Sequence, residues 1–392
     1  MKNSPGVIVI GDHVQALGII RSLGRHGIPV YLLHDQNLCI GRFSRYTTRY
    51  IKIPDACKES EFIDFLIRLA KNDQVKDWML MPTNDAWVYM LSKHKEILEE
   101  YYRVPTPDWD VVKLAYDKRL TYSIAEKNEI PIPRTIYFEN SDDVYEKLKN
   151  IRFPVIIKGA HGYEFYRKTG VKVLLARSHN DLVWYYKKYS AIINPSETVV
   201  QEVIPGNSST FSFCSFRNNE LIVYWCGLKI REHPMNFGTG TFAQSVRIPE
   251  VIELGTRFLS LINYYGISEI EFKKDQNDGK YKLIEMNART WLWHSLAIRC
   301  GIDFPYLLYK DMNGEKVVPQ SSFKENVKWI HLYTDLWVAL NEIAKGNFNV
   351  GNYIKSLKGE KEFAVFSLDD PLPFLCETIM LPYLWRNRWG GN

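Results

Sequence analysis

The chain has 392 residues, 46% of them hydrophobic and 24% charged, and a formal net charge of +5. The length predicts two or three globular domains, and the mild charge without a basic run gives no case for nucleic-acid binding. Six scattered cysteines without paired spacing argue against a zinc site, and we identify neither a signal peptide nor an apolar run long enough to span a membrane, so we expect reduced thiols and a cytoplasmic protein.

The first 112 residues predict an α/β domain. A β-branched run over 7–10 precedes a helical pattern, and a second strand follows. This βαβ order indicates a parallel sheet, whose ligands bind beyond the carboxyl ends of the strands. The segments 11–13 and 83–85 follow two such ends and are candidates for substrate contact, although Asp85 could equally cap the next helix.

Two lysines follow in the next stretch. Lys118 lies in a helical segment over 111–127, and Lys158 ends the apolar strand 155–158. A lysine after a buried strand either reaches into a cleft as a charge for phosphate or leaves the sheet into solvent, and the solvated lysine is favoured when Lys158 is considered alone. The stretch 161–170 is a glycine-bounded loop between two strands, which could close over a ligand or be an ordinary hairpin loop.

Further strands are expected over 198–204 and in a pair that follows, and the segment 248–264 predicts an amphipathic helix. Lys229 and Arg231 come directly after the second of the paired strands. Because they are two residues apart, on a strand they would share one face.

The segment 269–289 predicts a β-hairpin with two acidic side chains in register. Alternating runs flank Asn277-Asp278-Gly279, a strong turn signal. With the turn centred there, Glu271 lies opposite Glu285, and Glu269 lies opposite Asn287. The apolar face is expected to hold Ile270, Phe272, Ile284 and Met286. Facing carboxylates are unfavourable in a sheet unless something neutralises them, and a hard divalent cation would do so; the alternative is a solvated face on which the glutamates splay apart.

The sequence after residue 319 is less regular. A helix is expected over 329–345, and the tail 363–389 is apolar and interrupted by prolines. Its segment Trp385-Arg386-Asn387-Arg388-Trp389 could lie at a membrane interface. Packing onto the protein itself or onto another subunit is favoured, because Asp369, Asp370 and Glu377 argue against insertion.

The order of these motifs resembles the ATP-grasp superfamily. The motifs are Asp117-Lys118, FPVIIKG with Lys158, VVQEVIPG, IEF with Glu271, and LIEMNAR with Glu285, Asn287 and Arg289. Within the superfamily the chain is similar to predicted carboxylate-amine ligases related to D-aspartate ligase, on the strength of GDHVQALGIIRSLGRHGIPV, FSRY, LMPTND and GIDFPYLLY. The resemblance spans residues 1–318.

The resemblance implies an α/β and α+β multidomain fold. A Rossmann-like pre-ATP-grasp domain would occupy residues 1–112. The small and large lobes of an ATP-grasp domain would follow over 113–198 and 199–318, and residues 319–392 would form a C-terminal extension.

The resemblance also implies roles for individual residues. Lys118 and Lys158 would hold the ATP phosphates, the segment with His161 and Gly162 would close over them, and Gln201, Glu202 and Val203 would receive adenine. The Mg²⁺ ligands would be Glu271, Glu285 and Asn287, with Glu269 outside the ligand set as a supporting or solvated residue. Arg289 would stabilise the transferring phosphoryl group, and Lys229 and Arg231 would contact substrate or phosphate. The chain departs from the family pattern after Arg289, where Trp291 and Trp293 replace small residues and could form an aromatic wall beside the substrate. His294 could be a catalytic acid or base, but a lone histidine among tryptophans is more often structural.

The activity implied is that of an ATP- and Mg²⁺-dependent ligase that joins a small carboxylate to an amine through an acylphosphate. Bicarbonate or thiol acceptors, and a nucleotide-binding scaffold without turnover, are the alternatives. A homodimer and peripheral membrane contact through the C-terminal tail are compatible with each of these activities.

Overall fold

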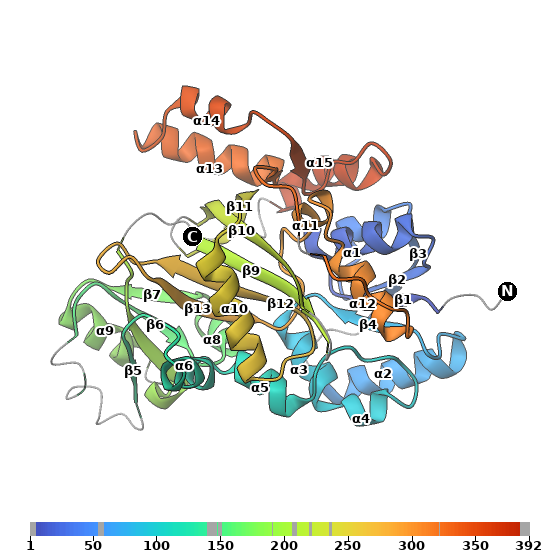
Figure 1. Ribbon diagram of the computed structural model, residues 1–392, viewed down its shortest axis with the longest axis horizontal. Helices are drawn as coiled ribbons and strands as arrows, with labels where there is room; N and C mark the ends of the chain where they lie inside the picture. Colours follow the sequence, from blue (N-terminus) through green and yellow to red (C-terminus); the bar gives the residue numbers. More distant parts are fainter. Residues whose placement is uncertain are drawn as a thin grey trace.

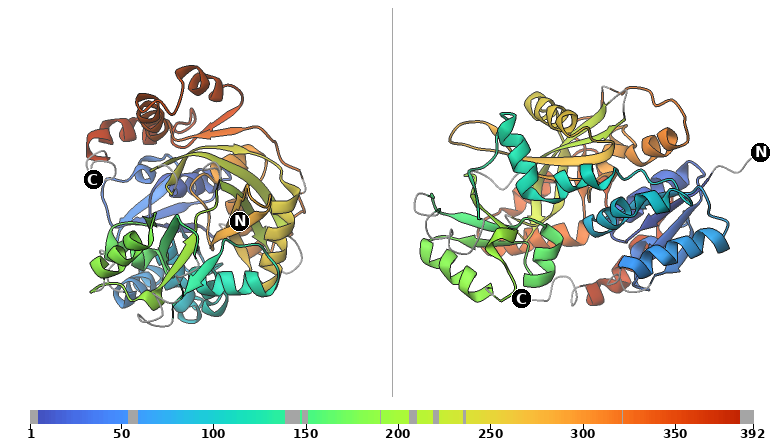
Figure 2. Two further views of the ribbon diagram at one scale, coloured as in Figure 1. Left: turned by 90° about the vertical axis from the view of Figure 1, so that its left-hand side faces the viewer. Right: turned by 90° about the horizontal axis from the view of Figure 1, so that it is seen from below.

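The computed structural model describes residues 5–53, 59–138, 147, 151–189, 191–205, 210–218, 222–234, 237–320 and 322–384. Within these residues the strands form three sheets of four, seven and four strands. The blue N-terminal sheet and the green small sheet lie toward opposite ends of the long axis, and the large sheet lies between them (Figures 1 and 2).

The N-terminal sheet is parallel throughout, with the strand order β3-β2-β1-β4. Its strands are β1 (Val7–Ile10), β2 (Val30–His34), β3 (Thr47–Lys52) and β4 (Met79–Pro82). Helix α1 (Val14–Arg25) connects β1 to β2, so the predicted βαβ unit is confirmed. All four residues of β1 are buried, because side chains on the two faces of the strand enter two different cores.

Helices cover this sheet and connect it to the rest of the chain. They are α2 (Glu59–Asn72), α3 (Asp85–Lys93), α4 (Lys95–Leu98), α5 (Trp109–Tyr116) and α6 (Lys118–Lys127). The predicted helical segment 111–127 is therefore two helices. Asp117 separates them, with an extended backbone, and its carboxylate accepts a hydrogen bond from the backbone N–H of Arg119 at 2.9 Å.

The small sheet is antiparallel, with the order β5-β8-β6-β7. Its strands are β5 (Thr135–Tyr137), β6 (Val155–Gly159), β7 (Val173–Ala176) and β8 (Thr198–Glu202), and α9 (His179–Tyr189) precedes β8. The predicted loop 161–170 is instead largely the helix α8 (Gly162–Thr169), because Phe165 provides an apolar anchor and Gly170, with φ of +75°, ends the helix.

The large sheet has the order β13-β12-β9-β10-β11-β14-β15. Its strands are β9 (Thr210–Arg217), β10 (Ile222–His233), β11 (Thr239–Ser245), β12 (Gly266–Lys274), β13 (Tyr281–Asn287), β14 (Lys328–Ile330) and β15 (Lys361–Phe363). Helix α10 (Pro249–Leu261) lies across this sheet (Figure 1), and α11 (Ser295–Arg299) and α12 (Phe304–Met312) follow β13. Trp329 belongs to β14, so the helix predicted from residue 329 begins only at α13 (Leu332–Ala344).

The β12–β13 hairpin has the predicted register at its acidic end. Glu271 pairs with Glu285, and Glu269 pairs with Asn287. A bulge after Glu271 pairs Phe272 with Leu283 and leaves Ile284 partly exposed. The prediction that Ile284 shares the buried apolar face is therefore wrong, and Leu283 takes that place.

The C-terminal extension adds α13, α14 (Val350–Ser356), β15 and α15 (Leu372–Leu384) on one side of the molecule (Figure 1). Within the described part of the chain, no helix is both long and apolar enough to cross a membrane. The predicted interfacial segment Trp385 to Trp389 lies outside the described residues.

Candidate active site

A cavity of about 440 Å³ lies where the three sheets approach one another. This volume is in the range of small-molecule sites. Its lining comes from the loop after β4, from α6 and α8, and from strands of both the small and the large sheet. Among the lining residues are Asp85, Lys118, Lys158, Gly162, Gln201, Glu202, Val203, Lys229, Glu232, Glu269, Glu271, Glu285, Asn287, Arg289 and Trp293.

Lys158 on β6 and Lys118 on α6 both line the cavity. Lys158 is buried at the end of β6, and its ammonium donates to Gln201 Oε1 at 3.1 Å. Burial lowers the pKa of Lys158 to about 8, although the carboxylate of Glu285 opposes this shift. Lys118 begins α6, and its Nζ lies 3.6 Å from Glu285 Oε2. The two predicted phosphate-binding lysines therefore lie in one cavity, and Lys158 is not the solvated lysine that its strand alone would favour.

Glu285 and Glu271 face each other on β13 and β12 and each contacts a lysine. Burial alone would raise the pKa of Glu285, but Lys118 and Lys158 together lower it to about 2, so this carboxylate is ionised near neutral pH. Glu271 Oε2 lies 3.4 Å from Lys229 Nζ. The like charges are thus compensated by cations that enter the cavity from three different elements.

Glu269 lies deeper in the hairpin than predicted. It is buried, and it accepts hydrogen bonds from Ser212 at 2.9 Å and from Asn287 Nδ2 at 3.0 Å. Burial, followed by the neighbouring Glu271, raises the pKa of Glu269 to about 8. It is therefore not solvated; instead it orients the amide of Asn287 so that the amide oxygen points toward Arg289, which donates to it at 3.1 Å.

Arg289 links the hairpin to the N-terminal sheet. Its Nε and Nη2 donate to the two carboxylate oxygens of Asp85 at 2.7 and 3.1 Å. The neighbouring Asn84 caps α3 by accepting from Trp87 N at 3.1 Å, so the capping role considered for Asp85 belongs to Asn84. Asp85 does not cap the helix; it lines the cavity and its carboxylate is paired with Arg289. Gly11, Asp12 and Thr83, also considered for substrate contact, do not line the cavity.

Gln201, Glu202 and Val203 line one end of the cavity at the end of β8. Their polar groups already have protein partners. Glu202 Oε1 accepts from Arg152 N at 3.0 Å, and the backbone N–H of Val203 donates to Pro154 O at 3.1 Å. A ligand at this end would therefore be met by their remaining acceptors and by apolar surface.

Gly162 and His161 behave differently although they are adjacent. Gly162 begins α8 and lines the cavity so closely to Lys118 that an added Cβ would lie 3.5 Å from the ammonium. His161 does not line the cavity, because its ring points to Asp117 and Glu164 at 3.4 and 3.5 Å. The hydrogen bond to Asp117 raises the pKa of His161.

Arg231 does not join Lys229 in the cavity. A β-bulge between the two residues breaks the alternation of β10, since Lys229 pairs with Ala243 and Arg231 with the adjacent Phe242. The guanidinium is buried, donates to both carboxylate oxygens of Asp335 at 2.8 and 2.7 Å, and packs over the ring of Phe242. The prediction that Lys229 and Arg231 share one face is therefore wrong, and Arg231 anchors α13 to the sheet.

The same bulge brings Glu232 into the site, where sequence reasoning did not expect it. Its Oε2 lies 3.3 Å from Lys229 Nζ, whereas its Oε1 is buried and has no hydrogen-bond partner among the residues that the structure describes. Burial raises the pKa of Glu232. Strict alternation would place Glu232, three positions after Lys229, on the opposite face of the strand. The sequence signal for Glu232 was therefore only that it lies close to Lys229 in the chain.

Of the two tryptophans after Arg289, one lines the cavity and the other belongs to the hydrophobic core. Trp293 lines the cavity, but Trp291 is buried against Trp225 and Phe304. His294 is buried and its Nε2 lies 2.9 Å from Gln15 O. Burial lowers the pKa of His294 to about 4, which agrees with the structural role expected for it.

The donor set suits a hard cation, although no group of three carboxylate, histidine or cysteine side chains in the described ranges is arranged to hold a metal. Glu271 and Glu285 provide two carboxylates in register, and Asn287 provides an amide oxygen beside them. Oxygen ligands of this kind are those that Mg²⁺ prefers, and Mg²⁺ commonly takes one or two carboxylates together with substrate phosphates.

The chain is similar in sequence to one curated protein and in fold to several solved structures. No protein-family model matches the chain. The D-aspartate ligase of Enterococcus faecium is 27% identical over 338 residues, which cover 81% of this chain and 79% of that protein. The structure of the L-amino acid ligase of Bacillus licheniformis has a TM-score of 0.62 at 16% identity, covering 80% of this chain and 75% of that one. A biotin carboxylase complex with β,γ-ATP from Campylobacter jejuni has a TM-score of 0.65 at 18% identity, covering 82% and 74%. The chain therefore has the fold of the ATP-grasp superfamily and, among curated proteins, resembles D-aspartate ligase.

Proposed function

We propose that the chain is an ATP- and Mg²⁺-dependent ligase that joins a carboxylate to an amine. The observation that supports this most directly is the cavity in which Lys118, Lys158 and Lys229 surround the facing pair Glu271 and Glu285. Phosphoryl transfer depends mainly on positioning and on charge neutralisation, and this arrangement supplies fixed charges of both signs. The names of two similar proteins, D-aspartate ligase and L-amino acid ligase, support the amine acceptor.

In this proposal the nucleotide lies along the cavity from the end of β8 to the hairpin. Gln201, Glu202 and Val203 surround the adenine, and Lys158 and Lys118 bind phosphate oxygens. Gly162 allows those oxygens to approach the start of α8 closely, because it lacks a side chain. His161 holds Asp117 and thereby the start of α6, rather than contacting the nucleotide.

The residues that would hold Mg²⁺ are Glu271, Glu285 and Asn287. When bound, the ion would neutralise charge on the phosphates. Glu269 supports this set by orienting the Asn287 amide, and its neutral form at pH values below about 8 avoids a third negative charge beside the pair.

The chemical steps follow from the groups around the hairpin. A carboxylate oxygen of the substrate attacks the γ-phosphorus, and the bond to the β-phosphate oxygen breaks, giving ADP and an acylphosphate. Arg289 and Lys229 stabilise the negative charge of the transferring group. The amine nitrogen then attacks the acyl carbon, phosphate leaves with the electron pair of the carbon–oxygen bond, and the nitrogen loses a proton to give the amide.

The same proposal gives each predicted domain a role. Residues 1–112 would carry part of the substrate pocket through Asp85, residues 113–198 and 199–318 would enclose the nucleotide, and residues 319–392 would be an accessory extension.

The test is ATP turnover with panels of carboxylates and amines, with hydroxylamine present in a parallel series to trap the acylphosphate as a hydroxamate. Bicarbonate and thiol arms distinguish the other acceptors. Glu285→Gln should lower turnover at least about 100-fold, because it removes a charged ligand, whereas Glu253→Gln on the exposed side of α10 should not. ATP binding without phosphate release from the wild type in every arm would instead identify a nucleotide-binding scaffold.

A further inference from the structure

The C-terminal extension carries an unusual share of exposed apolar surface. Of 19 large apolar side chains exposed in the described part of the chain, nine lie between residues 319 and 384. They are Leu336, Leu340, Val350, Ile354, Phe366, Leu368, Leu372, Leu375 and Ile379. Single exposed apolar residues are ordinary, whereas a concentration of them indicates a surface that another body covers.

The outer face of α15 is the most apolar part of this surface. Leu372, Leu375 and Ile379 are spaced by three and four residues, so they lie on one side of the helix, and they are 54%, 52% and 79% exposed. Leu368, just before the helix, is 87% exposed. The other exposed positions between 371 and 382 are two prolines and a threonine, so this face carries no charge.

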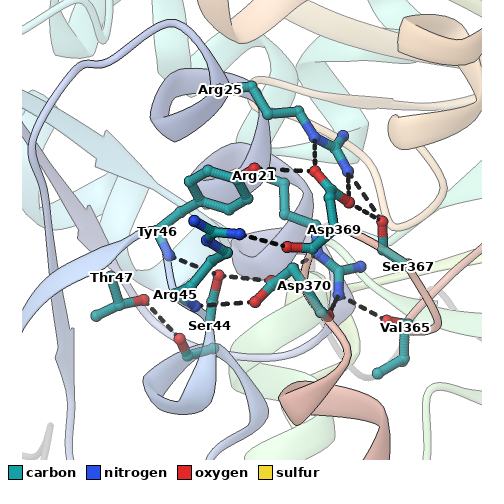
Figure 3. Close-up of polar contacts among 11 residues, drawn as sticks. Arg21, Arg25, Ser44, Arg45, Tyr46, Thr47, Val365, Ser367, Asp369 and Asp370 are labelled. Carbon is teal, nitrogen blue, oxygen red and sulfur yellow. Dashed lines mark hydrogen bonds and ion pairs between the residues drawn. The ribbon is translucent and has the colours of Figure 1, made fainter.

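The two acidic residues just before α15 are each paired with an arginine of α1, and of the two only Asp370 is buried. Asp370 is buried, and it accepts hydrogen bonds from Arg21 Nε at 2.9 Å, from the Ser44 hydroxyl at 2.7 Å and from the backbone N–H of Arg45 at 2.8 Å (Figure 3). The neighbouring Asp369 receives two hydrogen bonds of 2.9 Å from the guanidinium of Arg25 (Figure 3). These contacts fix the segment before α15 onto α1 and onto the residues that precede β3.

The acidic residue within α15, Glu377, is turned inward. Glu377 is buried, and its Oε1 lies 2.8 Å from His331 Nε2. On the same inner side, Phe374 stacks on Tyr333 with ring centroids 5.5 Å apart. Of the three acidic residues that argued against a membrane contact in the sequence, Asp370 and Glu377 are buried and the half-exposed Asp369 is paired with Arg25, so none of them is an exposed residue of α15.

We propose that the outer face of α15 lies on an anionic phospholipid surface. Apart from the apolar face, the sequence after the helix favours this partner. Residues 378–392 include no acidic residue, whereas Arg386 and Arg388 lie among them, flanked by Trp385 and Trp389. Arginine suits an anionic surface, and tryptophan suits the boundary between lipid headgroups and acyl chains. A helix of 13 residues is too short to span a bilayer, so it would lie in the plane of the surface.

This proposal is independent of the proposed catalytic function. Among the described residues the cavity lining ends at Trp293, so no described residue of the C-terminal extension contributes to it. A ligase without lipid binding and a lipid-binding protein without ligase activity would therefore give different results.

The test is co-sedimentation of the full chain with vesicles of phosphatidylcholine, with and without phosphatidylglycerol. The wild type should bind the vesicles that contain phosphatidylglycerol, and binding should weaken as salt is raised. The double variant Leu375→Glu with Ile379→Glu should bind at least about tenfold more weakly, because two charged groups would enter the interface. Leu261→Glu with Val318→Glu is the matched control, since both residues are exposed apolar residues elsewhere, and it should bind as the wild type does.

A second variant, Arg386→Glu with Arg388→Glu, should reduce the preference for phosphatidylglycerol without touching the described helix. Absence of vesicle binding by the wild type, or equal binding by both double-glutamate variants, would overturn the proposal. So would light scattering that shows a wild-type dimer converted to a monomer by Leu375→Glu with Ile379→Glu, because that face would then be a contact between two copies of the chain.

Discussion

Arg289 and Asp85 form a two-point ion pair, with nitrogen–oxygen distances of 2.7 and 3.1 Å, between the end of β13 and the start of α3. The pair connects two regions that are 204 residues apart in the chain and aligns the guanidinium beside Asn287. It therefore couples the position of the N-terminal sheet to the position of a charge in the proposed reaction.

Asp85→Asn should release that alignment. We expect turnover to fall about 10–100-fold, because the guanidinium would no longer be held in one orientation. Nucleotide affinity should change little, since Lys118 and Lys158 are intact. Steady-state kinetics and calorimetric ATP titration measure the two effects separately, and Asp12→Asn, outside the cavity, is the control. A loss of nucleotide affinity as large as the loss of turnover would contradict this role.

The depressed pKa of Lys158, about 8, predicts a pH-dependent nucleotide affinity. As the pH rises through this value the ammonium loses its proton, so the affinity for ATP should fall between about pH 7 and pH 9. Lys158→Arg, which keeps its charge, should bind with a flatter pH profile. An identical profile for the two proteins would show that Lys158 does not contact the phosphates.

The same pKa gives the sign of a stability effect. The pKa of Lys158 is about 8 in the folded protein and about 10.4 in the unfolded chain. Between these two pH values the unfolded chain binds more protons at Lys158 than the folded protein does. The free energy of unfolding therefore rises as the pH rises through this window. This contribution is complete above the unfolded pKa and lost as the pH falls through the folded value. Lys158→Met should remove it, and chemical unfolding at the two pH limits measures the difference.

Lys229 and Arg231 should respond in opposite ways to truncation. Lys229→Ala removes a cation from the cavity and should lower the turnover of the folded protein at least about 100-fold. Arg231→Ala leaves the buried Asp335 without its partner and should destabilise the fold by about 3–5 kcal/mol, while the folded fraction keeps its turnover. Turnover loss in a stably folded Arg231→Ala would return Arg231 to the catalytic set.

The contacts of the C-terminal extension predict a contrast between neighbouring aspartates. Asp370→Asn breaks a buried pair with Arg21 and should cost about 3–5 kcal/mol. Asp369→Asn affects a half-exposed pair with Arg25 and should cost about 0–1 kcal/mol. Limited proteolysis should show cleavage after residue 365 sooner in the first variant than in the second. Equal unfolding midpoints would mean that the segment is not held by Asp370.

Much of the site followed from local sequence rules. The βαβ order fixed the parallel sheet, and the turn at Asn277 to Gly279 fixed the register that brings Glu271 opposite Glu285. These features depend on short-range periodicity and turn chemistry, which a sequence displays directly.

Two of the errors arose where one inserted residue changes which side of a strand a residue faces. The bulge in β10 sends Arg231 to Asp335 and brings Glu232 beside Lys229, and the bulge in β12 exchanges Ile284 for Leu283. Alternation cannot reveal a bulge, because the bulge is a property of pairing with a partner strand. The pairing of Asp85 with Arg289 was likewise inaccessible, since it depends on how two sheets meet.

The most direct test of the central claim is hydroxylamine trapping with the purified full chain, ATP, Mg²⁺ and a panel of carboxylates that includes amino acids. We expect a hydroxamate together with ADP and phosphate in equal amounts for at least one carboxylate, and we expect all three products to be lost on removal of Mg²⁺ and in Glu285→Gln. A chain that fails to bind ATP in the presence of Mg²⁺, measured by calorimetry, would contradict it.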